Sequence, residues 1–178
     1  MPNPLHPALV HFPIVFMVLL PIAAVVSLWA IRQGARHSRA WLVPLAFAVA
    51  LSGSAWLAVE TGEQQEERVE DVVPESAVEH HAGAAEQFLL LSVAVTVLVG
   101  LGLVRGRVGQ VARGAAVAAA AALTFAGYRV GHSGGELVYR HGAASAYVGA
   151  AGAGEGAGRS EAALGSEAKG EEEERERR

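Results

Sequence analysis

The chain has 178 residues, with 14 Lys and Arg against 18 Asp and Glu and a formal net charge of −4. Apolar residues make up 52% of it and cysteine is absent. The lack of cysteine excludes disulfides, thiolate zinc sites, iron–sulfur clusters and covalently attached c-type haem. A weakly acidic chain without a basic stripe is not expected to bind nucleic acid.

Four long apolar runs dominate the chain, and each is long enough to cross a bilayer. A helix needs about 20 apolar residues to cross a hydrocarbon core of about 30 Å. The first run is not expected to be a cleaved signal peptide, because no Lys or Arg precedes Arg32. Membrane-spanning helices are therefore predicted over residues 8–31, 41–60, 81–104 and 108–131.

The distribution of arginine predicts how these helices are oriented. The turn after the first helix and the turn after the third contain arginines and no acids, namely Arg32, Arg36, Arg39, Arg105, Arg107 and Arg113. The remaining loop, 60–79, holds one arginine among many acids. By the positive-inside bias the arginine-rich turns are cytoplasmic, and both termini face the periplasm of a bacterial inner membrane. Short turns make neighbouring helices antiparallel. We therefore predict an all-α integral membrane four-helix bundle, up-down-up-down, with an N-out/C-out topology.

Two further segments follow the fourth helix. Residues 131–142 form a Gly-rich outer segment, which completes a transmembrane domain spanning 1–148. Residues 149–178 are rich in Ala, Gly and Glu, and such a composition buries too little apolar area to fold. The tail is predicted to be disordered and to carry no site.

Histidines gather at one end of the predicted bundle. Six of the seven fall at the outer end, namely His6, His11, His80, His81, His132 and His141, whereas His37 lies in an inner turn. Each taken alone is compatible with an interfacial side chain. His11 stands out because it lies one turn inside the first helix, where polar groups are expensive and usually functional. Together the histidines suggest a shared ligand or cofactor site.

Imidazole is a good ligand for haem iron, Cu and Zn, and facing helices of a bundle commonly hold cofactors. Our first hypothesis is one or two b-type haems near the outer face. His11 and His81 would form one axial pair, and His132 and His141 a second pair or supporting groups. Arg129 and Arg140 would meet the haem propionates. The alternatives are a Cu or Zn site that also draws on His6 and His80, and a structural or assembly subunit whose histidines are incidental.

Two motifs carry a resemblance to a known family. The opening LHPALVHFPIVF and the late GHSGGELVYRHG resemble the two signatures of DUF2231, a family of four-helix bacterial membrane proteins, over residues 4–148. That family also has a histidine opening its third helix, which His80 or His81 matches. Relatives joined to cytochrome c-like or Rieske-type domains imply an electron-transfer setting. The resemblance thus implies a membrane-bound electron-transfer subunit rather than a stand-alone enzyme. It would act with such a redox protein, in a larger membrane complex or as a homo-oligomer.

Overall fold

The computed structural model describes residues 5–147, and the predicted disordered tail lies outside them. Every regular element in this part of the chain is a helix, in the order α1 (Leu5–Leu9), α2 (His11–Arg32), α3 (His37–Ala40), α4 (Leu42–Glu63), α5 (Glu66–Glu70), α6 (Glu75–Leu101) and α7 (Gly106–Tyr139). Four stretches are long and apolar enough to cross a membrane, namely Leu5–Arg32, His37–Glu63, Glu75–Leu101 and Gly106–Tyr139. The predicted all-α membrane fold is confirmed.

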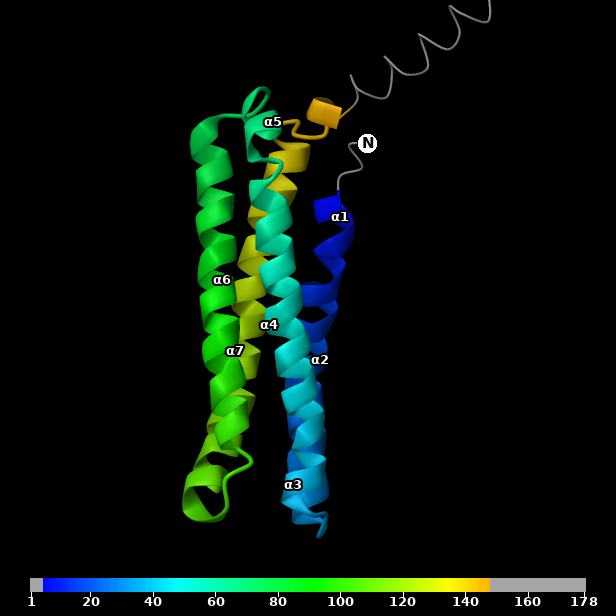
Figure 1. Ribbon diagram of the computed structural model, residues 1–178, viewed down its shortest axis with the longest axis vertical. Coiled ribbons are helices and arrows are strands. Elements are labelled where there is room, and N and C mark those ends of the chain that lie inside the picture. The colour runs from blue at the N-terminus through cyan, green and yellow to red at the C-terminus, as the bar shows by residue number, and fades with distance from the viewer. Residues whose placement is uncertain (1–4, 148–178) are drawn as a thin grey trace, which may run out of the picture.

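The four long helices form an antiparallel bundle (Figure 1). Helix α2 packs on α4, α4 on α6, α6 on α7, and α7 closes the ring against α2. The end of the bundle where α1 starts and α7 finishes carries His6, His81 and His132, and we call it the histidine end. The opposite end carries α3 and the turn from α6 to α7, and we call it the arginine end after Arg32, Arg36, Arg39, Arg105 and Arg107.

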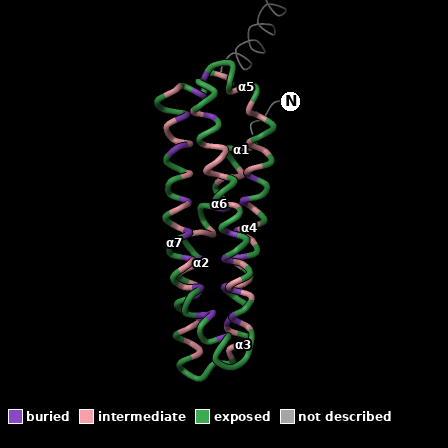
Figure 2. Tube along the Cα trace, turned by 90° about the vertical axis from the view of Figure 1, so that its left-hand side faces the viewer, coloured by how far each residue is buried: buried purple, intermediate pink, exposed green. Residues whose placement is uncertain are grey.

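Burial divides each long helix into an inner and an outer face. Buried residues line the inside of the bundle and exposed residues its outside (Figure 2). Many exposed residues are large and apolar, including Trp29, Leu90 and Phe125, whose exposed fractions are 62%, 71% and 67%. Such extensive apolar exposure around the helices is what contact with lipid requires, whereas soluble proteins expose small patches only.

Small residues of the alanine-rich helix α7 let the helices approach closely. Ala116 and Ala120 of α7 are buried in the same core cluster as Leu20 and Leu51. A Cβ atom added to Gly127 would clash with the side chain of Met17, so this glycine makes room for Met17 between α7 and α2. In lipid, where apolar burial gives no drive for association, such packing holds helices together.

Two helices extend further at the histidine end than the sequence predicts. Helix α6 starts at Glu75, directly after Pro74. The ring of a proline clashes with a preceding helical turn, so the helix does not extend to residues before Pro74. Helix α7 continues through the Gly-rich segment to Tyr139. Leu137 is buried there against Val73 and Val78, and these contacts stabilise turns that glycine alone would weaken. The Gly-rich segment is therefore largely helical rather than a separate unit.

Trp41 joins the two hairpins at the arginine end. Its indole is fully buried and donates a hydrogen bond from Nε1 to the carbonyl of Val99, at 2.8 Å. The guanidinium of buried Arg113 donates to the carbonyl of Gly102. Both carbonyls belong to the end of α6, where helical acceptors lack their usual partners and where a positive charge suits the helix dipole. The turn that contains α3 is thereby held beside the turn from α6 to α7.

Candidate functional site

A break in the first membrane-spanning stretch sets the position of His6. Pro13 has no N–H to donate to the carbonyl of Leu9, and its ring clashes with that carbonyl, so α1 ends at Leu9 and α2 begins at His11. Helix α1 packs on α4. As a result the imidazole of His6 is half-buried, and its Nδ1 lies 2.8 Å from the carbonyl oxygen of Ala58.

The hydrogen bond to Ala58 fixes the tautomer of His6. A carbonyl oxygen only accepts, so Nδ1 carries the proton and Nε2 keeps a free lone pair. The hydroxyl of Thr61 lies 3.5 Å from the same Nδ1, but its proton is donated to the carbonyl of Leu57 at 2.8 Å. His6 therefore presents an unprotonated Nε2, the form in which imidazole binds metals.

His81 on α6 is held in the same way. Its Nδ1 lies 2.9 Å from the hydroxyl oxygen of Ser133 on α7, and that hydroxyl donates its own proton to the carbonyl of Val130 at 2.9 Å. With that proton on the Val130 carbonyl, the oxygen of buried Ser133 accepts a hydrogen bond from Nδ1 of His81. The Nε2 of His81 is left with its lone pair free.

Glycines provide the room for both rings. A Cβ atom on Gly62 of α4 would lie 3.2 Å from Cε1 of His6, and one on Gly134 of α7 would lie 3.0 Å from Cε1 of His81. His6 and His81 are both half-buried at the histidine end of the bundle. We call these two residues the imidazole pair. Helices α1 and α6 supply its rings, and α4 and α7 supply the groups that hold them.

The other histidines of the predicted site lie elsewhere at this end. His11 is exposed, and its Nδ1 lies 3.3 Å from the carbonyl of Ala8 in the preceding turn. His80 and His132 are exposed as well, and the ring of His132 meets that of Tyr128 edge to face. His141 follows α7 and is half-buried. Of the predicted axial pair, His81 is therefore half-buried and hydrogen-bonded to α7, whereas His11 is exposed. The half-buried histidine of the first membrane-spanning stretch is His6.

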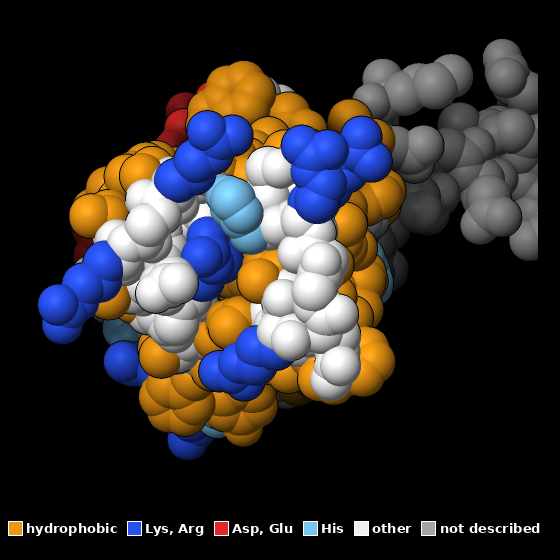
Figure 3. All heavy atoms as spheres, turned by 90° about the horizontal axis from the view of Figure 1, so that it is seen from below, with side chains coloured by type: hydrophobic (Ala, Val, Ile, Leu, Met, Phe, Trp, Pro, Cys, Tyr) orange, Lys and Arg blue, Asp and Glu red, His pale blue; other side chains and the backbone are white. Residues whose placement is uncertain are grey.

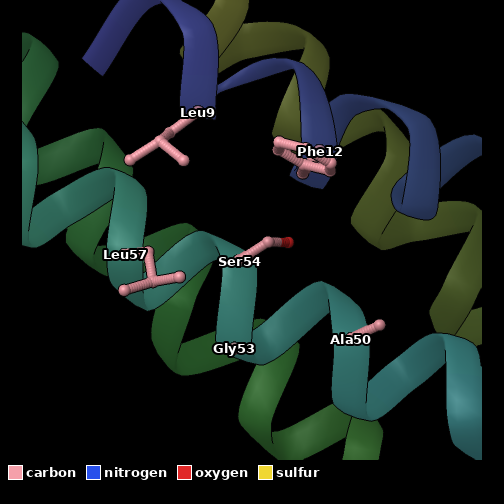
Figure 4. Close-up of a pocket in the computed structure, with 6 residues that line it drawn as sticks. All are labelled: Leu9, Phe12, Ala50, Gly53, Ser54 and Leu57. Carbon is pink, nitrogen blue, oxygen red and sulfur yellow. The ribbon is translucent and has the colours of Figure 1, made fainter. Parts of the chain in front are cut away.

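The predicted propionate partners lie on the outer surface of the bundle. Arg129 is exposed, and Arg140 forms an exposed ion pair with Glu136 at 3.0 Å. Arg140 and Glu136 line a shallow hollow on α7 together with His132, Gly135 and Tyr139. A second, almost wholly apolar groove opens between the α1–α2 break and α4, lined by Leu9, Phe12, Ala50, Gly53, Ser54 and Leu57 (Figure 4). Within residues 5–147, no group of three or more His, Asp or Glu side chains is arranged to hold a metal ion.

The segment after α7 closes the histidine end against the acidic loop. The hydroxyl of Tyr147 donates to Oε1 of Gln65 at 2.6 Å, and the guanidinium of Arg68 lies 5.8 Å from the centre of the same ring. Burial raises the pKa of Tyr147 above its ordinary value, against a smaller opposing effect of the Arg68 charge. Tyr147 therefore stays a neutral donor at physiological pH and keeps this hydrogen bond.

Four membrane-spanning helices with half-buried imidazoles at one end define a polytopic membrane protein with a candidate ligand site. The family described as "Predicted membrane protein (DUF2231)" matches residues 2–146, and the chain belongs to that family. The resemblance seen in the two sequence motifs is thus confirmed at the level of the family. Comparisons with curated proteins and with solved structures give no match.

Proposed function

We propose that this protein is a small membrane electron-transfer protein that binds a b-type haem at the histidine end, with His6 and His81 as its axial ligands. The imidazole pair carries this proposal. Each ring comes from a different helix, and each has its Nδ1–H bonded to an acceptor while Nε2 stays free. A hydrogen bond from the second ring nitrogen is the usual way in which proteins orient a metal-ligating histidine.

The number of ligands favours haem over a bare metal ion. The porphyrin supplies four nitrogens to iron, so two imidazoles complete the coordination, whereas zinc takes three or four protein ligands. A bound haem would supply one-electron transfer. The chain itself would hold the two neutral imidazoles. The Ala58 carbonyl and the Ser133 hydroxyl orient the rings. Gly62 and Gly134 leave space for them.

We further propose that the histidine end faces the periplasm of a bacterial inner membrane and the arginine end faces the cytoplasm. The positive-inside bias supports this orientation, because the arginine-end turns contain no acid. A haem near one face does not by itself carry electrons across the bilayer. Its partner would be a redox protein at the same face, such as a c-type cytochrome or a Rieske-like protein, or a larger membrane complex. Its second ligand set, His132 and His141, stays a prediction for a second haem.

The test is an optical spectrum of the full chain, produced with ample haem, purified in detergent and recorded before and after reduction by dithionite. We expect the sharp bands of low-spin b haem, which are lost in His81→Ala and in His6→Ala. His11→Ala is the matched control, because it makes the same change on an exposed ring one turn away, and it should keep the bands.

Each other result has a clear meaning. Loss of the bands in His11→Ala together with their retention in His6→Ala would restore the pair favoured by the sequence. A featureless wild-type spectrum would contradict haem binding, and elemental analysis for Cu and Zn would then separate a metal site from a structural subunit.

Adjacent glycines give a second test of the same site. A Cβ atom on Gly134 meets His81 at 3.0 Å, whereas one on Gly135 meets nothing within 4 Å. Gly134→Ala should displace the His81 ring and weaken haem binding by about tenfold, the lower end of what changes around a metal ligand cause. Gly135→Ala should bind as the wild type does in a haem titration. Equal affinities in the two variants would show that Gly134 does not position His81.

A further inference from the structure

The arginine end concentrates positive charge without any acid beside it. Its five exposed arginines come from the two turns, and residues 32–41 and 102–113 contain no Asp or Glu. Buried Arg113 adds a further positive charge, which meets the carbonyl of Gly102. In the described part of the chain, the one ion pair joins Arg140 to Glu136 at the opposite end. The charges of the arginine end are therefore uncompensated by carboxylates within residues 5–147.

The fold brings these charges onto one surface. The hydrogen bond from Trp41 to Val99 holds the α3 turn, with Arg36 and Arg39, against the end of α6, which Arg105 and Arg107 follow. Seen from this end, basic side chains are spread over the face, and acidic side chains appear only at its margin (Figure 3). The surface is therefore a single basic face rather than two separate loops.

The ends of the four long helices indicate how deep this surface lies in the bilayer. The apolar stretches of all four long helices end here. Trp29, one turn before Arg32, exposes 62% of its surface, and exposed tryptophans prefer the level of the lipid headgroups. The arginines thus stand at the height at which phospholipid phosphates lie.

We propose that the arginine end binds the phosphate of an anionic phospholipid, with Arg36, Arg39 and Arg105 as its main contacts. Guanidinium groups bind phosphate oxygens through paired hydrogen bonds, and basic surfaces between helix ends attract anionic headgroups. This inference does not depend on the haem, because it concerns the opposite end of the bundle.

The experiment titrates the full chain, purified in a neutral detergent, with short-chain phosphatidylglycerol and separately with the matching phosphatidylcholine. Binding is followed by tryptophan fluorescence and by the thermal midpoint. We expect saturable binding of phosphatidylglycerol alone. The variant Arg36→Gln/Arg39→Gln/Arg105→Gln should bind it about tenfold more weakly. The control Arg129→Gln/Arg140→Gln, with arginines changed at the other end, should bind as the wild type does.

Three results would overturn the proposal: equal binding of both lipids, equal affinity in the two variants, or displacement of the lipid by millimolar inorganic phosphate. The last would mark a site for free phosphate instead of a headgroup. A far-ultraviolet dichroism spectrum that matches the wild type establishes that the triple variant is folded. A triple variant that does not fold is replaced by the three single substitutions, whose combined effect is judged by the same criteria.

Discussion

Replacement of Gly109 by alanine is expected to destabilise the bundle strongly. The added Cβ atom would lie 1.8 Å from the carbonyl oxygen of Val104 and 2.8 Å from its carbonyl carbon. These are backbone atoms of the turn between α6 and α7, so they cannot move away as the tip of a side chain can. Overpacking of this kind costs about 1–3 kcal/mol and sometimes more. We expect a fall of several degrees in the thermal midpoint of the detergent-purified protein.

Gly114 provides the matched control for this prediction. It lies in the same helix, and a Cβ atom at Gly114 meets nothing within 4 Å. Alanine favours helix over glycine by about 1 kcal/mol, so Gly114→Ala should leave the midpoint unchanged or raise it. An equal fall in the thermal midpoint of both variants would mean that the contact with Val104 is not the reason why Gly109→Ala is destabilising.

The fold could be predicted because the bilayer limits the choices. Apolar runs of about 20 residues separated by short turns leave few arrangements other than an antiparallel helical bundle. The ends of the helices could not be predicted with equal accuracy, because α6 and α7 continue beyond their apolar stretches. That extension depends on Pro74 and on the burial of Leu137 against Val73, a contact between residues far apart in the sequence.

The candidate site was predictable as a cluster but not as a pair. In a soluble helix, the apolar stripe tells which residues turn inward. A membrane helix is apolar on all faces, so the pattern around His11 does not reveal that its ring is exposed. His6 and His11 stand five positions apart, and at about 100° per residue they point to different sides. The packing of α1 on α4 then turns His6 toward Ala58, while His11 stays exposed.

The groups that hold the imidazole pair were missed for a related reason. Ala58 acts through its backbone carbonyl, and Ser133 lies 52 positions from His81. No local spacing signals either contact. The available hint was the pair of glycines after Ser133, of which Gly134 faces His81 and Gly135 does not.

Removal of the Trp41 side chain should have the largest effect on stability of any single substitution considered for this protein. The indole is fully buried, and Gly102 leaves the space that it fills, since a Cβ atom there would lie 2.1 Å from Nε1. Truncation of a buried tryptophan to alanine costs about 3–5 kcal/mol, because neighbours collapse only partly into the cavity. We expect Trp41→Ala to unfold at a much lower temperature or denaturant concentration.

Two further variants separate the contribution of indole burial to stability from that of the hydrogen bond to Val99. Trp56→Ala removes an indole from the lipid-facing side of α4, where 55% of the residue is exposed, and should change the midpoint little. Trp41→Phe keeps most of the ring but removes the donor to Val99, whose carbonyl then retains only the N–H of Gly102. That loss should cost about 0.5–1.5 kcal/mol.

The Trp41 variants also connect stability to the surface of the arginine end. If Trp41 holds the two turns together, Trp41→Phe should weaken phosphatidylglycerol binding less than the triple arginine variant does, because every arginine is still present. Trp41→Ala should weaken binding more than Trp41→Phe, since the α3 turn is no longer packed against the end of α6. Equal lipid affinity in the wild type and in folded Trp41→Ala would mean that the arginines act one by one, without the shared surface that the indole creates.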